Sequence, residues 1–131
     1  MEMREILFRG KARVNGEWVY GDLIHEYRGR ERGIYQNGPE IVYPLLPKTE
    51  GQYTGLIDKN GKKIFEGDII KFGKSLGAVN YDEGCFCVKP NKPYWRRLSN
   101  PAIDIVMNEY PNEIEVIGNI HDNPELLEAT T

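Results

Sequence analysis

The stretch IFEGDIIKF, residues 64–72, joins two short apolar runs through Gly67-Asp68. Glycine readily adopts the backbone angles of a bend, whereas the β-branched and aromatic residues on both sides favour strands. Just upstream, Lys59-Asn60-Gly61-Lys62 contains the Asn-Gly pair that is typical of a tight hairpin turn. This part of the chain therefore predicts a hairpin, a bend and a new strand in close succession.

The residues after this stretch extend the same pattern. A strand is expected at residues 77–81, a turn at Asp82-Glu83-Gly84 and a further strand at residues 85–88. Short strands joined by tight turns form a bent antiparallel meander. Together with the Gly-Asp that precedes an apolar run, they favour a small SH3-like barrel.

The N-terminal part of the chain also alternates with the period of a strand. Residues 4–13 lead into Asn15-Gly16, a pair suited to the two positive φ angles of a type I′ turn. Residues 18–24 form the expected returning strand. Trp18, Tyr20, Phe65 and Ile69 are candidates for the core.

Later segments are less regular. Short strands are expected at residues 33–36 and 41–46, and Pro44 restricts the second to a sheet edge. Residues 49–55 are expected to be irregular.

The C-terminal third gives mixed signals. The apolar residues between positions 101 and 111 do not decide between helix and strand, whereas residues 113–120 alternate as a strand does. Asn123-Pro124-Glu125 combines a helix cap, a proline suited to the first helical turn and an acidic residue, so a short C-terminal helix is expected.

The composition is that of an ordinary globular protein. The chain has 131 residues, of which 40% are hydrophobic and 28% are charged, and this length suits one domain. We expect a single mostly-β domain over residues 1–131, all-β or α+β. A division into an N-terminal hairpin part (1–50) packed on an SH3-like part (51–131) is the alternative.

The sequence lacks the marks of membrane insertion or export. Its apolar runs fall short of the ~20 residues that a membrane helix needs, and its N-terminus lacks the uninterrupted apolar stretch of a signal peptide. A cytoplasmic location without membrane contact is expected.

The chain has two cysteines, Cys85 and Cys87, which would lie on one face of a strand. Two reduced thiols are the expectation in a reducing cytosol. A zinc site would need two further ligands, and neither His25 nor His121 is near the thiols in sequence. No metal site is predicted.

Catalytic motifs are missing from the sequence. Neither a Gly-x-Ser-x-Gly elbow nor a glycine-rich phosphate loop occurs. The acidic pairs Glu66/Asp68 and Asp82/Glu83 fall at turns, where acidic residues are common. No catalytic residue and no cofactor are predicted, although hydrolysis by paired carboxylates stays an open alternative.

Charge is distributed unevenly along the chain. Residues 101–131 contain seven acidic residues and neither Lys nor Arg, whereas the first hundred residues carry 17 basic and 13 acidic residues. Such asymmetry can mark an interaction surface, or charge matching within the chain or between subunits.

Residues 89–97 combine four cations with two aromatic side chains and contain no acidic residue. The set is Lys89, Lys92, Tyr94, Trp95, Arg96 and Arg97. Cations can follow a phosphate backbone and aromatic rings can stack on bases. The alternatives are a loop that docks on the acidic third of a neighbouring subunit, and a basic loop without a specific role. Arg28, Arg30 and Arg32 form a second, weaker cluster.

A second candidate binding segment is Gln52-Tyr53-Thr54, a mostly polar triplet between two glycines. It has no evident packing task in the sequence, so a binding loop is one interpretation.

Three blocks of sequence are long and unusual in composition. They are MREILFRGK with GEWVYGDL (3–11, 16–23), GQYTGL with DKNGK and EGDI (51–56, 58–62, 66–69), and IEVIGNI with DNPELL (114–120, 122–127). In this order they resemble the YopX family of phages and prophages. The resemblance spans most of the chain and implies a phage or prophage origin, a largely β fold and self-association. It supplies no catalytic residues and no established activity.

Two function classes lead. The first is a non-enzymatic, homo-oligomeric phage or prophage accessory protein in the bacterial host cytoplasm, a scaffold whose loops contact a phage or host protein. The second is a small nucleic-acid-binding module that uses residues 89–97. An enzyme ranks third and would require a deep pocket with converging titratable side chains.

Overall fold

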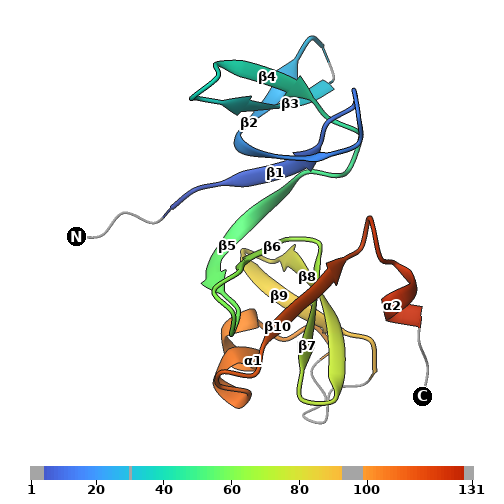
Figure 1. The fold of residues 1–131 in the computed structure, drawn as a ribbon. Coiled ribbons are helices and arrows are strands. Elements are labelled where there is room, and N and C mark those ends of the chain that lie inside the picture. The colour runs from blue at the N-terminus through green and yellow to red at the C-terminus, as the bar shows by residue number, and fades with distance from the viewer. Residues whose placement is uncertain (1–4, 30, 93–98, 129–131) are drawn as a thin grey trace. The chain divides into compact units, whose positions relative to one another are not determined.

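The computed structural model describes residues 5–29, 31–92 and 99–128, and this part of the chain is mostly β (Figure 1). The chain forms two compact units, Met1–Gly55 (unit 1) and Leu56–Thr131 (unit 2). The strands pair antiparallel in both units, which confirms the predicted fold class. Closure into an SH3-like barrel and the organisation as one family domain stay predictions.

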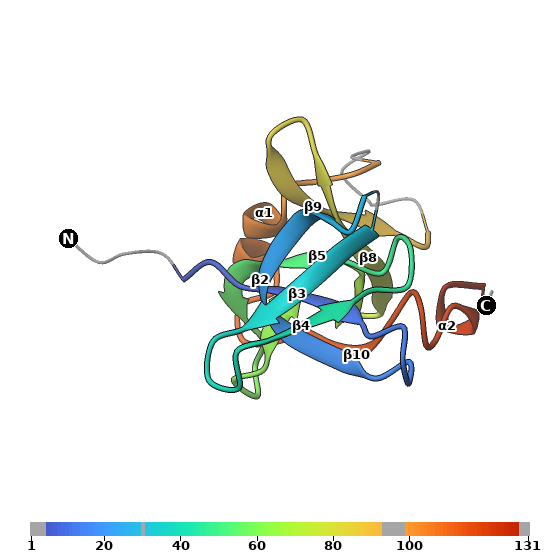
Figure 2. The same ribbon diagram turned by 90° about the horizontal axis from the view of Figure 1, so that it is seen from above.

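Unit 1 is built around one antiparallel sheet. Its strands are β1 (Phe8–Lys11), β2 (Trp18–Tyr27), β3 (Glu31–Gln36), β4 (Ile41–Pro44) and the start of β5 (Gly51–Ile57), in the order β4-β3-β2-β1-β5. Figure 2 shows β2, β3 and β4 side by side, as their pairing requires. β4 is the edge strand, as Pro44 predicted. Ala12 and Ile34 are fully buried in this unit.

The hairpin between β1 and β2 is confirmed, but its turn differs from the predicted type I′. The N–H of Ala12 donates to the Glu17 carbonyl at 2.9 Å, so residues 13–16 form a four-residue loop. Gly16 has a φ of 71°, whereas Asn15 has no positive φ. The pairing of Ala12 with Glu17 makes the loop too long for a two-residue turn, so only its last residue needs the left-handed conformation.

The prediction of an irregular segment at residues 49–55 was wrong over most of its length. Residues 51–57 form β5, and its start pairs with β1 through Phe8–Gln52 and Arg9–Gly51. Tyr53 and Thr54 favour a strand but Gly51 and Gly55 do not, so the local sequence is mixed and the pairing with β1 decides the conformation.

Unit 2 contains the end of β5 and a second sheet. Strand β6 (Lys63–Phe65) follows the predicted turn after β5. The second sheet has the order β10-β7-β8-β9, from β7 (Asp68–Phe72), β8 (Ser75–Asp82), β9 (Cys85–Pro90) and β10 (Glu115–Asn119). Helix α1 (Ile103–Glu109) settles the segment that the sequence left undecided, and α2 (Glu125–Glu128) is the predicted C-terminal helix.

The core of unit 2 comes from its strands and from α1. Its buried residues are Ile64, Ile70, Phe72, Val79, Val88, Ile103, Val106 and Ile114. Ile103 and Val106 are three positions apart, so a helix places both side chains in this core. This burial favours a helix between residues 101 and 111.

Three of the four predicted core residues are at least partly buried. Phe65 and Ile69 are buried, and Trp18 is half-buried beneath the Arg9 guanidinium, whose carbon lies 4.5 Å from the ring centroid. Tyr20 is 45% exposed, so its assignment to the core was wrong. A tyrosine combines an apolar ring with a polar tip, so a half-exposed position suits it.

Asp58, in the β5–β6 turn, organises several backbone groups. Its Oδ1 accepts the N–H groups of Asn60 and Lys62 at 2.9 and 2.8 Å, and its Oδ2 accepts that of Val116 at 3.0 Å. Burial raises the pKa of Asp58, but these hydrogen bonds and the charge of Lys62 lower it by more, so the pKa lies below its usual value.

The predicted turn between β8 and β9 is tight and has type I′ geometry. Glu83 and Gly84 both have positive φ angles, of 48° and 83°, and the flanking residues Asp82 and Cys85 pair directly. This two-residue loop matches the twist of the two strands.

Candidate functional site

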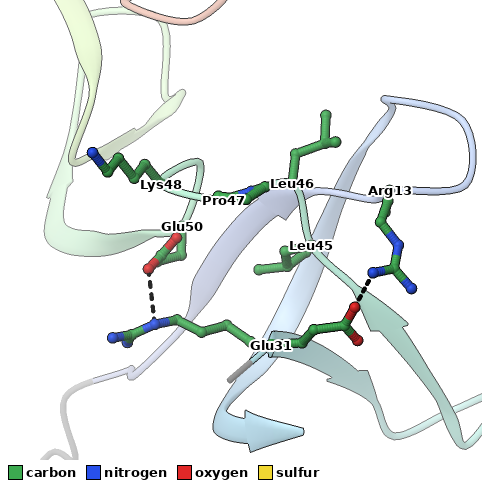
Figure 3. Close-up of a pocket in the computed structure, with 8 residues that line it drawn as sticks. Arg13, Glu31, Leu45, Leu46, Pro47, Lys48 and Glu50 are labelled. Atoms are coloured by element: carbon green, nitrogen blue, oxygen red, sulfur yellow. Dashed lines mark hydrogen bonds and ion pairs between the residues drawn. The ribbon is translucent and has the colours of Figure 1, made fainter. Parts of the chain in front are cut away.

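A groove of about 420 Å³ opens on unit 1 (Figure 3). We call it the unit 1 groove. It is lined by Arg13 from the loop after β1, by Glu31 and Arg32 of β3, and by the segment between β4 and β5. That segment contributes Leu45, Leu46, Pro47, Lys48 and Glu50. The volume of the groove is in the range of pockets that hold a small ligand or a few side chains.

The apolar surface of the groove comes from three consecutive residues. Leu45 is buried, Leu46 is half-buried and Pro47 is exposed. The apolar surface therefore extends from the core of the unit to the solvent. Contact with an apolar side chain of a partner would remove this surface from water, which favours binding.

Two ion pairs frame this apolar surface. Arg13 pairs with Glu31, and Arg32 Nε lies 3.1 Å from Glu50 Oε2 (Figure 3). A terminal nitrogen of Arg32 also lies 2.9 Å from His25 Nδ1. These pairs are partly exposed, so they add little stability, but they fix the charged groups around the groove.

The backbone of the groove is held in place by hydrogen bonds. The N–H of Leu45 donates to the Arg32 carbonyl and that of Leu46 to the Lys11 carbonyl, at 2.9 and 2.8 Å. The buried Thr49 hydroxyl donates to the Leu46 carbonyl at 2.7 Å and accepts the N–H of Lys11 at 3.0 Å. A ligand would therefore meet a preorganised surface, which lowers the entropy cost of binding.

Lys48 is the unusual residue of the groove. It is exposed, it has a φ of 65°, and its side chain makes no ion pair or hydrogen bond with the described part of the chain. A non-glycine residue in this left-handed region of backbone angles is uncommon. The other two cations of the groove, Arg13 and Arg32, are paired with carboxylates. Among the described groove residues, Lys48 is therefore the cation whose charge is available to a ligand.

The groove therefore suits a particular kind of ligand. Apolar surface beside an available ammonium group complements a short segment that carries apolar side chains next to carboxylates. The sequence could not predict this site, because Arg13, Arg32 and Lys48 are brought together only by the register of the sheet.

The predicted basic–aromatic site is placed only in part. Lys89 at the end of β9 and Lys92 just beyond it are exposed. Tyr94, Trp95, Arg96 and Arg97 lie outside the described residues, and so does Arg30 of the second cluster. Nucleic-acid binding at residues 89–97 stays a prediction.

The triplet Gln52-Tyr53-Thr54 lies within β5. Tyr53 is buried, with 8% of its surface exposed, and its N–H donates to the Leu7 carbonyl at 2.8 Å. Gln52 and Thr54 are half-buried. A binding role for these residues stays a prediction.

Cys85 and Cys87 lie together at the start of β9. Their Sγ atoms are 3.3 Å apart, both thiols are free, and Cys85 is exposed whereas Cys87 is buried. Burial, the hydrogen bond with Cys85 and the negative charges of Asp82 and Glu83 raise the pKa of Cys87 to about 11. Over residues 5–29, 31–92 and 99–128, no cluster of three or more His, Cys, Asp or Glu side chains could hold a metal ion.

The helices that the structure describes are short. None of them has the length and apolar character that crossing a bilayer requires.

The architecture and the groove define the class of the protein: a mostly-β protein of antiparallel sheets, with a preformed groove on unit 1. A family model described as YopX protein matches residues 7–128. This match covers most of the chain, which therefore belongs to the YopX family.

A solved structure has a similar fold. It is described as the crystal structure of protein EF1440 from Enterococcus faecalis, and the similarity has a TM-score of 0.58 with 24% sequence identity. The match covers 95% of this chain and 99% of that chain. At this identity the similarity shows the fold alone. A comparison with curated proteins gives no match.

Proposed function

We propose that the protein is a non-enzymatic, self-assembling interaction module. In the assembly, the unit 1 groove of one copy takes the acidic segment of another copy, defined as residues 122–128. The observation that supports this proposal is the complementarity between the available Lys48 in the groove and the exposed carboxylates of Glu125 and Glu128 in that segment.

The acidic segment has the composition that the groove calls for. Leu126 and Leu127 lie side by side in α2 between Glu125 and Glu128. Both glutamates are exposed, and neither side chain makes an ion pair or hydrogen bond with residues that the structure describes. The two leucines are only half-buried, and α2 has no fully buried residue. The segment can therefore offer apolar side chains and carboxylates together.

The wider charge pattern supports assembly between copies. The C-terminal residues 101–131 carry seven acidic residues and no cation, whereas the first hundred residues are net basic. Contact between the basic part of one copy and the acidic part of another lowers electrostatic energy and steers association. Because one surface binds a different surface, the contact is head-to-tail and can form rings or chains.

A peptide titration tests the proposal directly. A fluorescein-labelled peptide of residues 121–128 is added to the protein and its anisotropy is followed, with a peptide carrying Lys at positions 125 and 128 as the control. Binding of the first peptide only, weakened by salt and lost in the Leu46→Asp variant, supports the groove. Equal binding of both peptides, or of neither, contradicts it.

Nucleic-acid binding by residues 89–97 is the second candidate. It is supported by the exposure of Lys89 and Lys92, the two cations of this segment that the structure describes. Labelled single- and double-stranded oligonucleotides are titrated at low and moderate salt. Binding that weakens steeply with salt and is lost when Lys89 and Lys92 become Ala favours it, and flat titrations at both salts exclude it.

The setting that we propose is a phage or prophage accessory role in the bacterial cytoplasm, in which the assembled module presents its loops to a phage or host protein. The support is the resemblance of the three sequence blocks to the phage and prophage family. Affinity purification from infected or prophage-carrying cells, with the Leu46→Asp variant as the matched control, identifies such a partner.

A further inference from the structure

The two thiols of β9 have a spacing that packing alone does not require. Along an extended strand, residues two apart have Cα atoms ~6.6 Å apart and parallel side chains. The Sγ atoms of Cys85 and Cys87 are nevertheless only 3.3 Å apart. The two side chains therefore lean toward each other.

The backbone that carries this pair is firmly held. Cys85 pairs with Asp82 and Cys87 with Asn80 across the β8–β9 hairpin. The amides of Asn80 and Asn100 hydrogen-bond each other at 2.9 and 3.1 Å, and Asn80 Nδ2 lies 3.5 Å from the Cys87 carbonyl. Cys87 also forms a β-bridge with Ala102. Reorientation of the thiols thus depends on side-chain rotation rather than on backbone movement.

A bound ion fits this spacing better than a disulfide does. A disulfide brings the sulfurs to about 2.05 Å and prefers Cα atoms roughly 5.5–6 Å apart, so it would strain an extended strand. Two thiolates at about 2.3 Å from one ion are about 3.8 Å apart when the ion is tetrahedral and up to about 4.6 Å apart when it is linear and two-coordinate. The ~6.6 Å between the Cα atoms lets side-chain rotation separate the sulfurs to this distance without backbone movement.

We propose that Cys85 and Cys87 form a two-thiolate site for a soft, thiophilic metal ion of low coordination number, of the Cu(I) class. Thiolates select soft ions, and Cu(I) is satisfied by few ligands. A structural zinc site takes four protein ligands, and no cluster of three or more suitable side chains occurs in the described part of the chain.

The surroundings of the pair give an ion both access and an anchor. Cys85 is exposed and gives the ion a path from solvent, whereas the buried Cys87 anchors the site. On binding, two S–H bonds break and two Cu–S bonds form, while two protons pass to solvent and copper keeps its oxidation state.

The test is an anaerobic titration with Cu(I), in competition with a coloured Cu(I) chelator. The wild-type protein is expected to take up about one Cu(I) per chain, and the bound ion is expected to protect the exposed Cys85 from alkylation. Cys85→Ser removes the exposed ligand and leaves the buried position intact, so its folding is not at risk. It is expected to lose the stoichiometric binding, as is Cys87→Ala, whose fold is checked by circular dichroism.

Three outcomes overturn the proposal. They are full Cu(I) uptake by the Cys85→Ser variant, half an ion per chain with chains bridged through Cys85, and Zn²⁺ competing equally with Cu(I). The groove takes no part in this titration, so the result is independent of the proposed self-assembly.

Discussion

The carboxylate of Asp58 accepts the backbone N–H of Val116 at 3.0 Å, across 58 positions of sequence. The same side chain accepts two N–H groups of its own turn. One buried residue thus joins the β5–β6 hairpin to β10.

We expect the Asp58→Asn substitution to destabilise the protein. An amide group replaces one carboxylate oxygen by a donor, so at least one of the three N–H groups loses its acceptor, at about 1–3 kcal/mol of unfolding free energy. Chemical denaturation measures the loss, and the exposed Asp22→Asn is the matched control, expected to change little.

The effect of Asp58 should also depend on pH. Its folded pKa lies below its ordinary value of 3.8, so the carboxylate stabilises the fold above that value, and the contribution is lost as the pH falls through the folded pKa. The difference in unfolding free energy between wild type and Asp58→Asn should therefore be constant near neutrality and shrink in acid. A difference that is unchanged in acid would show that the charge does not matter.

The type I′ turn at Glu83–Gly84 predicts opposite effects at its two positions. Gly84→Ala puts a side chain at a φ of 83° and should destabilise by about 1 kcal/mol. Glu83→Asn should stabilise by roughly 0.5 kcal/mol, because Asn tolerates the left-handed region better than Glu.

Gly38→Ala is the control for this turn. Gly38 has no positive φ and open space around its α-carbon, so the change should stay within about 0.5 kcal/mol. Equal thermal shifts for Gly84→Ala and Gly38→Ala would show that the turn geometry has no energetic weight.

The two thiols should react very differently with iodoacetamide in the folded, metal-free protein. Cys85 is exposed and should be alkylated quickly, whereas Cys87 is 5% exposed and has a pKa of about 11. The thiolate is the nucleophile, so mass spectrometry at mildly alkaline pH should find one modified site per chain, and two after unfolding. Rapid modification of both sites in the folded protein would contradict the burial of Cys87.

The raised pKa of Cys87 also predicts a loss of stability in base. A group whose folded pKa exceeds its ordinary value of 9.0 contributes fully below that value, and its contribution disappears as the pH rises through about 11. Cys87→Ala should therefore narrow the difference in melting temperature between neutral and strongly alkaline solution. An unchanged alkaline loss in this variant would assign it to other groups.

The turns were the part of the fold that the sequence predicted best, because their signals are local. Asn60-Gly61, Gly67-Asp68 and Glu83-Gly84 all mark turns between strands. The type I′ assignment at Asn15-Gly16 failed because the pairing of Ala12 with Glu17 sets the loop length, and this pairing is not visible in the dipeptide.

Features that depend on distant contacts could not be predicted in this way. Strand β5 has a polar sequence at its start and becomes a strand through β1. The unit 1 groove assembles side chains from three separate segments. The sequence around Lys48 also does not predict its left-handed backbone conformation. That the Lys48 ammonium group has no partner among the described residues is visible only in the folded structure.

The central claim is that Lys48 of one copy meets the carboxylates of the acidic segment of another. Sedimentation equilibrium tests this claim most directly. It compares the wild type with Lys48→Glu, with Glu125→Lys/Glu128→Lys and with the triple variant that combines them. Lys74→Glu and Glu26→Lys, on exposed sites, are the matched controls. Assembly should weaken in the first two variants, on the order of tenfold in dissociation constant, and recover in the charge-swapped triple variant. A monomeric wild-type protein, or a triple variant no better than its parents, would contradict the claim.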